Sequence, residues 1–143
     1  MFFKSVTSIT TDDLQNLLDE EAVENVRLEF KQGIPSKNEM LKKLSSFANT
    51  FDGYLVIGVE EDGTSGTISS IPGVDIESGF KQKIISWCFG GISAPLYAEV
   101  SEPIPSPQDP NKVCYVIYAA ENDLAPHFIN GRKGCYICCP APL

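Results

Sequence analysis

Apolar and charged residues alternate strictly in the stretch Val26-Arg27-Leu28-Glu29-Phe30-Lys31, with apolar residues at 26, 28 and 30 and charged residues at 27, 29 and 31. Successive side chains of a strand point to opposite faces, so this pattern predicts a strand with one buried and one polar face. Gly33-Ile34-Pro35 follows and should end the strand. The rest of the fold is built outward from this strand.

A helix is predicted directly after it. Ser36-Lys37-Asn38-Glu39 has the form of a capping box, in which the serine serves free N–H groups and the glutamate reaches back. The apolar residues that follow fall on one helical face: Met40, Leu41, Leu44, Phe47 and Ala48. We therefore expect a helix over residues 37–49 that packs on the sheet by this face, with its lysines off the face.

A second strand is predicted after the turn at Asp52-Gly53. Tyr54-Leu55-Val56-Ile57-Gly58-Val59 is apolar throughout, which is typical of a strand buried on both faces. Glu60-Glu61-Asp62-Gly63 then gives a hairpin signal. Because the connections are short, this strand should neighbour the strand at 26–31.

The remaining pattern predicts further elements in a fixed order. They are a first helix from Thr10-Thr11 to about Ala22, a strand at 67–69, a helix from Asp75 to Gly90-Gly91, a weak strand at 96–100, a proline-rich loop at 103–110, a buried strand at 113–118, and short strands at 126–129 and 134–139. The order α-β-α-β-β-α-β-β-β-β predicts an α+β fold, a mixed β-sheet with about three packed helices. With 143 residues, we expect one domain spanning 1–143.

Composition limits the function. The net charge of −8 excludes a generic basic DNA-coating protein, because such proteins attract phosphates with an excess of Lys and Arg. Residues 27–43 reverse the sign, with five basic residues against two acidic ones. The sequence has no export signal, no apolar stretch long enough for a bilayer and an odd count of five cysteines. We expect a soluble, reduced, cytoplasmic protein with no membrane partner.

The cysteines do not predict a metal centre. Cys135-x-x-Cys138-Cys139 resembles half a zinc site, but the second half is missing. Cys88 falls in a predicted helix and Cys114 in a buried strand, while His127 stands alone. We interpret the thiols as buried or edge residues, and His127 as a packed hairpin residue.

Several ordered motifs match a known family. They are Leu28-Glu29-Phe30-Lys31, then Ser46-Phe47-Ala48-Asn49-Thr50-Phe51-Asp52-Gly53, then Leu55-Val56-Ile57-Gly58-Val59-Glu60-Glu61-Asp62-Gly63, and a closing hairpin at Ala125-Pro126-His127-Phe128-Ile129-Asn130-Gly131 with Gly134-Cys135-Tyr136-Ile137. Together they resemble the Schlafen AlbA-type domain over roughly residues 22–138. Three motifs in order at sensible spacing are far more specific than one short match.

The resemblance implies an association with nucleic acid. Many bacterial members are described as DNA-binding domains of regulators, which implies a role in transcription regulation, and some animal members cleave RNA with clustered carboxylates. Glu24, Glu29 and either Glu60 or Glu61 stand at the matching acidic positions. No cofactor is otherwise implied, and Mg²⁺ or Mn²⁺ would be needed only for catalysis.

The acidic positions meet a geometric difficulty. In one straight strand, residues 24 and 29 face opposite sides, so they converge only if the chain bends before Val26. The alternative is that Glu29 pairs with Arg27 or Lys31, while Glu24 and Glu60 are solvated ends of elements.

A basic surface is the second candidate site. It consists of Arg27, Lys31, Lys37, Lys42 and Lys43, which could bind phosphates, with Asn49 beside them as a hydrogen-bonding group. An ordinary solvated helix face is an equal alternative. Two departures from the family pattern weaken the site: Cys138 stands where an arginine is expected, and Asp52 replaces the first glycine of a pair.

Three hypotheses follow. The first is a non-catalytic nucleic-acid-binding domain whose binding is weak and indifferent to sequence. The second is a metal-dependent ribonuclease that uses the clustered carboxylates. The third is a protein-interaction or dimerisation module, with a homo-oligomer or a separate effector protein as partner.

Overall fold

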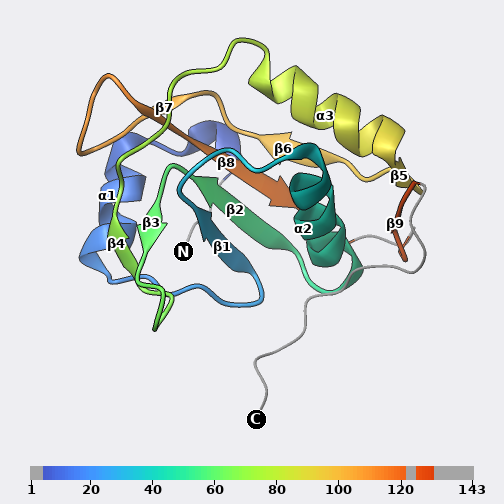
Figure 1. Cartoon of the computed structure of the whole chain (residues 1–143), viewed down its shortest axis with the longest axis horizontal. Coiled ribbons are helices and arrows are strands. Elements are labelled where there is room, and N and C mark those ends of the chain that lie inside the picture. Colours follow the sequence, from blue (N-terminus) through green and yellow to red (C-terminus); the bar gives the residue numbers. More distant parts are fainter. Residues whose placement is uncertain (1–4, 122–124, 131–143) are drawn as a thin grey trace.

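The computed structural model describes residues 5–121 and 125–130, in which a mixed β-sheet forms the centre of the molecule (Figure 1). Its strands run in the order β1 (Leu28–Lys31), β2 (Gly53–Ile57), β8 (Val113–Ala119) and β6 (Ala98–Val100), and β7 (Ile104–Pro105) also pairs with β8. β1 is parallel to β2, and every other pair in this sheet is antiparallel. The long strand β8 is therefore the axis of the sheet.

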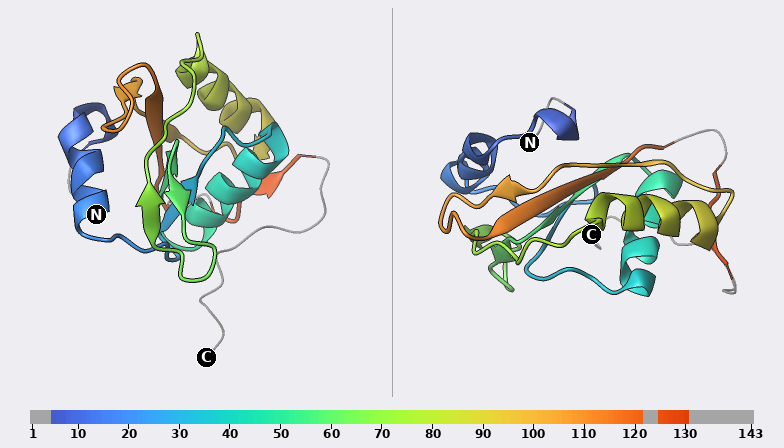
Figure 2. Two further views of the ribbon diagram at one scale, coloured as in Figure 1. Left: turned by 60° about the vertical axis from the view of Figure 1, so that its left-hand side comes forward. Right: turned by 90° about the horizontal axis from the view of Figure 1, so that it is seen from above.

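Helices cover both faces of the sheet (Figure 2). On one face lie α2 (Lys37–Asn49) and α3 (Phe80–Gly91), and on the other lie the short 3₁₀ helix η1 (Val6–Ser8) and α1 (Thr11–Asp19). Two separate clusters of buried side chains fill the two layers. Ile57 and Tyr115 belong to the layer under α2 and α3, whereas Val56 and Val116 belong to the layer under α1.

Two small sheets complete the described structure. β3 (Glu60–Glu61) pairs with β4 (Ile68–Ser70) beside α1, and β5 (Ile92–Ser93) pairs with β9 (Phe128–Ile129) beyond the end of α3. Both pairs are antiparallel.

The predicted fold class is confirmed. The described residues form three α-helices and a mixed sheet in the expected order, and the helix at 37–49 has the predicted bounds. Ser36 caps it by accepting a hydrogen bond from Glu39 N at 3.3 Å, and Met40, Leu41, Leu44 and Phe47 are all buried. The predicted neighbouring strands are adjacent, with Leu28 opposite Tyr54.

Some predicted boundaries are wrong, for local backbone reasons. The strand expected to reach Val59 ends at Ile57, because Gly58 takes a φ of 98° and turns the chain. β1 begins at Leu28 because Val26 and Arg27 lie in a turn. The helix expected from Asp75 begins only at Phe80, after Gly79 with a φ of 74°.

Other elements were not predicted. The first helix ends at Asp19 rather than near Ala22, and η1, β5 and β7 had no clear sequence signal. The proline-rich loop contains β7 because Ile104 and Pro105 pair with Cys114 and Val113. The strand expected at 134–139, together with Cys135, Cys138 and Cys139, lies outside the described residues.

The two described cysteines are buried as expected. Cys88 lies in α3 and Cys114 in β8, and both are free thiols. Burial raises the pKa of each thiol to about 12. Neither is therefore a reactive thiolate at neutral pH.

Candidate functional site

A tight turn directly before β1 positions the first acidic candidate. Asn25 N donates to Leu28 O at 3.0 Å, and Leu28 N donates back to Asn25 O at 3.2 Å. The chain thus makes the bend that the sequence required, and Glu24 comes to lie beside β1. Its Oε2 accepts a hydrogen bond from Phe30 N at 2.9 Å. Tyr54 N and Gly58 N donate to Arg27 O and Lys31 O from the β2 side. The Phe30 N–H therefore points to the other edge, and Glu24 closes the outer edge of the sheet.

Glu29 is placed differently, on the face that α2 covers. Its neighbours Leu28 and Phe30 are buried under α1, so its own side chain emerges on the opposite face. There Glu29 Oε2 lies 2.5 Å from Lys43 Nζ, and Oε1 lies 3.6 Å from Lys31 Nζ. The expected pairing of Glu29 with Lys31 is therefore present, whereas Arg27 pairs elsewhere.

The glutamates of β3 occupy a third place. Glu60 Oε2 accepts a hydrogen bond from Ser70 Oγ at 3.1 Å across the small sheet. Glu61 Oε2 is buried and accepts no hydrogen bond from the described residues. Gly66, in the turn between β3 and β4, lies close to two of the acids: a Cβ added there would be 3.5 Å from Glu24 Cβ and 3.7 Å from Glu61 Oε2.

The acidic candidates therefore do not form one compact group. Among residues 5–121 and 125–130, no three His, Cys, Asp or Glu side chains lie close enough together to hold a metal ion. Glu24 binds a backbone N–H, Glu29 binds lysines and Glu60 binds a serine. The catalytic role of Glu24, Glu29, Glu60 and Glu61 stays a prediction.

The basic candidates gather on α2 and on the strand beneath it. Lys37 and Lys42 are exposed on α2. Lys43, half-buried, bonds to Glu29 and lies 5.4 Å from the centroid of the Phe47 ring. Lys31 on β1 reaches the same glutamate. Glu29 thus holds two of the lysines in place and neutralises part of their charge.

Arg27 belongs to a separate polar cluster at the end of the sheet. Its guanidinium group contacts Asp52 Oδ1, and its Nε donates to Asp52 O at 3.3 Å. Tyr118 OH donates to the other oxygen, Asp52 Oδ2, at 2.7 Å. The ring of Tyr118 packs against that of Tyr54, with centroids 4.8 Å apart.

This environment keeps the Tyr118 hydroxyl protonated. Burial, followed by the hydrogen bond to Asp52, raises the pKa of Tyr118 to about 12. Burial first, then the negative charges of Asp52 and Glu99, raise the pKa of Tyr54 as well. Tyr118 was not among the residues predicted for the site, because nothing in the sequence of a buried strand indicates which of its ends reaches a charged loop.

Asn49 has a structural contact that the sequence did not indicate. Its Nδ2 donates to His127 O at 3.0 Å, and His127 N donates to its Oδ1 at 2.5 Å. His127 is itself buried, with Nδ1 2.5 Å from Ala94 O. The expected packing of His127 is confirmed, and Asn49 fixes the segment before β9 to the end of α2.

The comparison with protein families agrees with the motifs. The family model described as Schlafen, AlbA_2 matches residues 24–137, which include β1, α2, β2, α3 and β8. The chain belongs to the Schlafen AlbA_2 family. This confirms the resemblance drawn from the motifs. No curated protein matches the chain.

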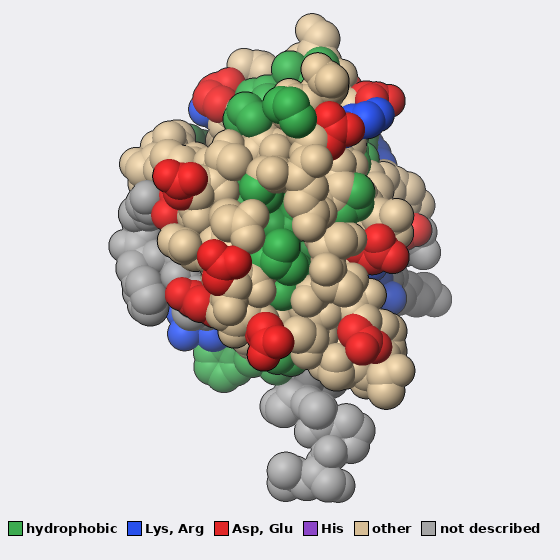
Figure 3. Space-filling model, turned by 90° about the vertical axis from the view of Figure 1, so that its left-hand side faces the viewer, with side chains coloured by type: hydrophobic (Ala, Val, Ile, Leu, Met, Phe, Trp, Pro, Cys, Tyr) green, Lys and Arg blue, Asp and Glu red, His purple; other side chains and the backbone are tan. Residues whose placement is uncertain are grey.

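On one side of this Schlafen AlbA_2 domain, most of the charged side chains are acidic, with a few Lys and Arg at the edges (Figure 3). A band of hydrophobic side chains runs down the middle of the face formed by α1, β4 and the loop after β7, with acidic side chains around it. The exposed or half-buried acids of α1, its C-terminal end and the β3–β4 hairpin are Asp12, Asp13, Asp19, Glu20, Glu21, Glu60, Glu61 and Asp62. Such a face repels a polyanion.

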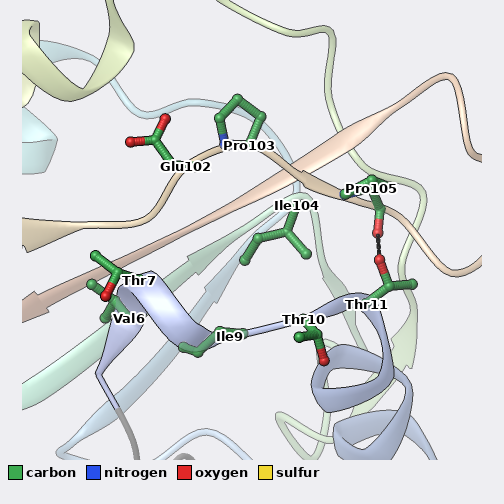
Figure 4. Close-up of a pocket in the computed structure, with 9 residues that line it drawn as sticks. All are labelled: Val6, Thr7, Ile9, Thr10, Thr11, Glu102, Pro103, Ile104 and Pro105. Atoms are coloured by element: carbon green, nitrogen blue, oxygen red, sulfur yellow. Dashed lines mark hydrogen bonds between the residues drawn. The ribbon is translucent and has the colours of Figure 1, made fainter.

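Two cavities in the described part of the chain are not lined by any of the basic candidates. One, of about 280 Å³, lies between η1, the start of α1 and residues 102–105 (Figure 4). Thr11 Oγ1 donates to Pro105 O at 2.8 Å across its end, and its walls carry no basic residue. A cavity of about 400 Å³ beside the start of α3 includes Lys81, which pairs with Glu102 at 3.5 Å.

The Schlafen AlbA_2 domain also shows no candidate membrane span. No helix in the described part of the chain is both long and apolar enough to cross a bilayer.

Proposed function

We propose that this Schlafen AlbA_2 domain is a non-catalytic nucleic-acid-binding domain that acts in regulation by holding the phosphate backbone. Family membership supports the class of ligand. The observation that carries the proposal is that α2 carries Lys37, Lys42 and Lys43, and that Lys43 meets Lys31 of β1 at Glu29, in a chain whose net charge is −8. Lysine ammonium groups are point charges that attract phosphates without reading base edges. Binding should therefore be weak, sensitive to salt and indifferent to sequence.

The test is a pair of matched double variants. Lys42→Gln/Lys43→Gln removes two charges from α2, and Lys81→Gln/Lys83→Gln removes two from α3. The control is matched because each pair contains at least one lysine that bonds to an acid: Lys43 to Glu29 in the first pair, and Lys81 to Glu102 and Lys83 to Glu77 in the second. Both variants carry the same net charge, so a general electrostatic effect would change their binding equally.

Fluorescence anisotropy with labelled oligonucleotides gives the readout. At about 20 mM salt, the α2 variant should bind at least about tenfold more weakly than the wild type, and its slope of log K against log salt should fall by about 1.5 to 2. The α3 variant should stay within about twofold of the wild type. Equal loss in both variants would place the contact elsewhere, and a wild type that binds neither DNA nor RNA at this salt concentration would contradict the proposal.

A protein-interaction module is the second candidate, and one observation favours it. The hydrophobic band on the α1 side is edged with acids, as in a surface that meets a basic partner (Figure 3). The net charge of −8 favours a separate basic protein over a second copy as the partner, and light scattering after size exclusion distinguishes a homo-oligomer from a monomer. A pure monomer at about 100 µM would argue against self-association through this face.

A further inference from the structure

We propose that Asp52 is an internal anion that occupies a phosphate-binding site formed by Arg27 and Tyr118, and that a phosphodiester group binds there by displacing it. The inference deepens the proposed function and rests on it for the identity of the natural ligand. The proposed site consists of the side chains of Asp52, Arg27 and Tyr118. Whether it binds phosphate can be tested with inorganic phosphate alone.

The two oxygens of the Asp52 carboxylate are held by two different donors. Oδ1 contacts the guanidinium group of Arg27, and Oδ2 accepts the Tyr118 hydroxyl at 2.7 Å. A planar cation beside a neutral hydroxyl donor is a set that phosphate oxygens also satisfy, because each oxygen can accept one of the two bonds. The carboxylate therefore stands where two oxygens of a phosphate would stand.

The position of Asp52 is fixed by the chain around it. It precedes Gly53, where an added Cβ would lie 2.2 Å from the Phe47 ring, so the backbone of this turn is held tightly against α2. Tyr118 lies opposite Tyr54 on the neighbouring strand and is fixed by β2–β8 pairing. Rotation of the Asp52 side chain would open the site, because Tyr118 is held by the sheet and Arg27 Nε donates to the backbone oxygen of Asp52, which does not move with the carboxylate.

Displacement is feasible because the ion pair is open to solvent. The side chain of Arg27 is 47% exposed and that of Asp52 is 30% exposed. Ion pairs at such a surface contribute little to stability, so a ligand with more charge can compete for Arg27. The neighbouring charge is Glu99, which lies opposite Tyr118 on β6 and opposes the entry of an anion. Asp52 and Glu99 together keep the site weak in the wild type.

The experiment removes the internal charge and then the donor. Asp52→Asn keeps the shape of the side chain, Asp52→Asn/Arg27→Gln also removes the guanidinium group, and Asp12→Asn removes one exposed charge from α1 as the matched control. With an oligonucleotide of about 20 residues at about 50 mM salt, Asp52→Asn should bind at least about fivefold more tightly than the wild type. Asp12→Asn should stay within about twofold, and the double variant should lose the gain.

A second readout uses inorganic phosphate and the NMR signal of the Arg27 Nε–H group. Phosphate should shift this signal in Asp52→Asn at lower concentration than in the wild type. Asp52→Ser replaces Asp52→Asn if the latter does not give a folded spectrum.

The outcomes separate the two proposals. If oligonucleotides bind and Asp52→Asn binds no more tightly than Asp12→Asn, the internal-anion inference is overturned while the proposed function stands. If no variant binds an oligonucleotide but phosphate shifts the Arg27 signal in Asp52→Asn, the phosphate site stands and the proposed function fails. If phosphate leaves that signal unchanged in both Asp52 variants, the inference is overturned.

Discussion

Helices α1 and α2 cover opposite faces of one sheet and present opposite charge to solvent. Both bury leucines completely or almost so, Leu14 and Leu17 in α1 and Leu41 and Leu44 in α2. Outside the core, α1 carries three aspartates and no basic residue, whereas α2 carries three lysines and one glutamate. The two helices thus pack on the sheet in the same way, and they differ in the charge of their exposed surfaces.

The largest expected effect is on stability, and it comes from the buried leucines that both helices have. Leu14→Ala and Leu44→Ala each empty a site that is 0% exposed, so each should lower the free energy of unfolding by about 2–5 kcal/mol. Urea denaturation followed by circular dichroism measures both. A loss below about 1 kcal/mol for Leu14→Ala would show that α1 is only loosely attached, and it would contradict the claim that the two helices pack on the sheet in the same way.

The helix caps give a smaller effect of the same kind. Thr10 accepts a hydrogen bond from Asp13 N and donates its own N–H to the Asp13 carboxylate, while Ser36 accepts from Glu39 N. Thr10→Ala and Ser36→Ala should each cost about 1 kcal/mol of unfolding free energy. Thr10→Ala should be the more costly, because the Thr10 hydroxyl both accepts from Asp13 N and donates to the Asp13 carboxylate at 3.1 Å. The same denaturation experiment would contradict this if Ser36→Ala were clearly the worse variant.

The next prediction concerns Glu29, the acid that pairs with lysines on the α2 side of the sheet. Glu29→Gln removes the acid that holds Lys31 and Lys43, so binding of an oligonucleotide should strengthen by about two- to fivefold at low salt. The free energy of unfolding should fall by less than about 1 kcal/mol, since the pairs are partly exposed. Anisotropy titrations beside Asp12→Asn as control measure the first effect. Weaker binding in Glu29→Gln would mean that the glutamate itself contacts the ligand.

The smallest expected effect is on the titration of the Tyr118 hydroxyl group at the end of the sheet. The pKa of Tyr118 is raised to about 12 by burial and by Asp52, above the value of about 10 for an unfolded tyrosine. The stabilisation linked to this shift is fully present below about pH 10 and is lost as pH rises through about 12. Following the Tyr118 Cζ signal by NMR, with Tyr118→Phe to assign it, should show a lower midpoint in Asp52→Asn. An unchanged midpoint would show that Asp52 does not bond to the hydroxyl in solution.

The sequence predicted those helices and strands whose apolar residues recur with a clear period. The α2 helix was found to the residue because the Ser36 cap and the apolar face both mark it. β1 and β2 were predicted as strands because their apolar patterns are strong, and as neighbours because the connections are short. The errors lie where the backbone departs from these patterns: Gly58 ends β2 early, and Gly79 delays the start of α3. β5 and β7, of two residues each, are too short to show a period.

The site was predicted less completely than the fold. Arg27 and the lysines were identified because charge off an apolar face is visible in the sequence, but the partners of these side chains were not. Tyr118 is 66 positions from Asp52 and His127 is 78 positions from Asn49, and pairing over such distances depends on tertiary structure. The bend before β1 was recognised as a condition for Glu24, and the structure contains it, but Glu24 binds the backbone of Phe30 there.

The most direct test of the central claim is a map of the contact surface. ¹⁵N-labelled protein titrated with a short oligonucleotide at low salt should show its largest amide shift changes in α2, in β1 and around Asp52, with little change in α1 and the β3–β4 hairpin. That result would place the nucleic acid on the lysines of α2 and β1 and on the cluster of Arg27, Asp52 and Tyr118 at the end of the sheet, where Tyr118 packs on the α1 side. Shift changes concentrated in α1 and the β3–β4 hairpin, or none at a saturating oligonucleotide concentration, would contradict the account.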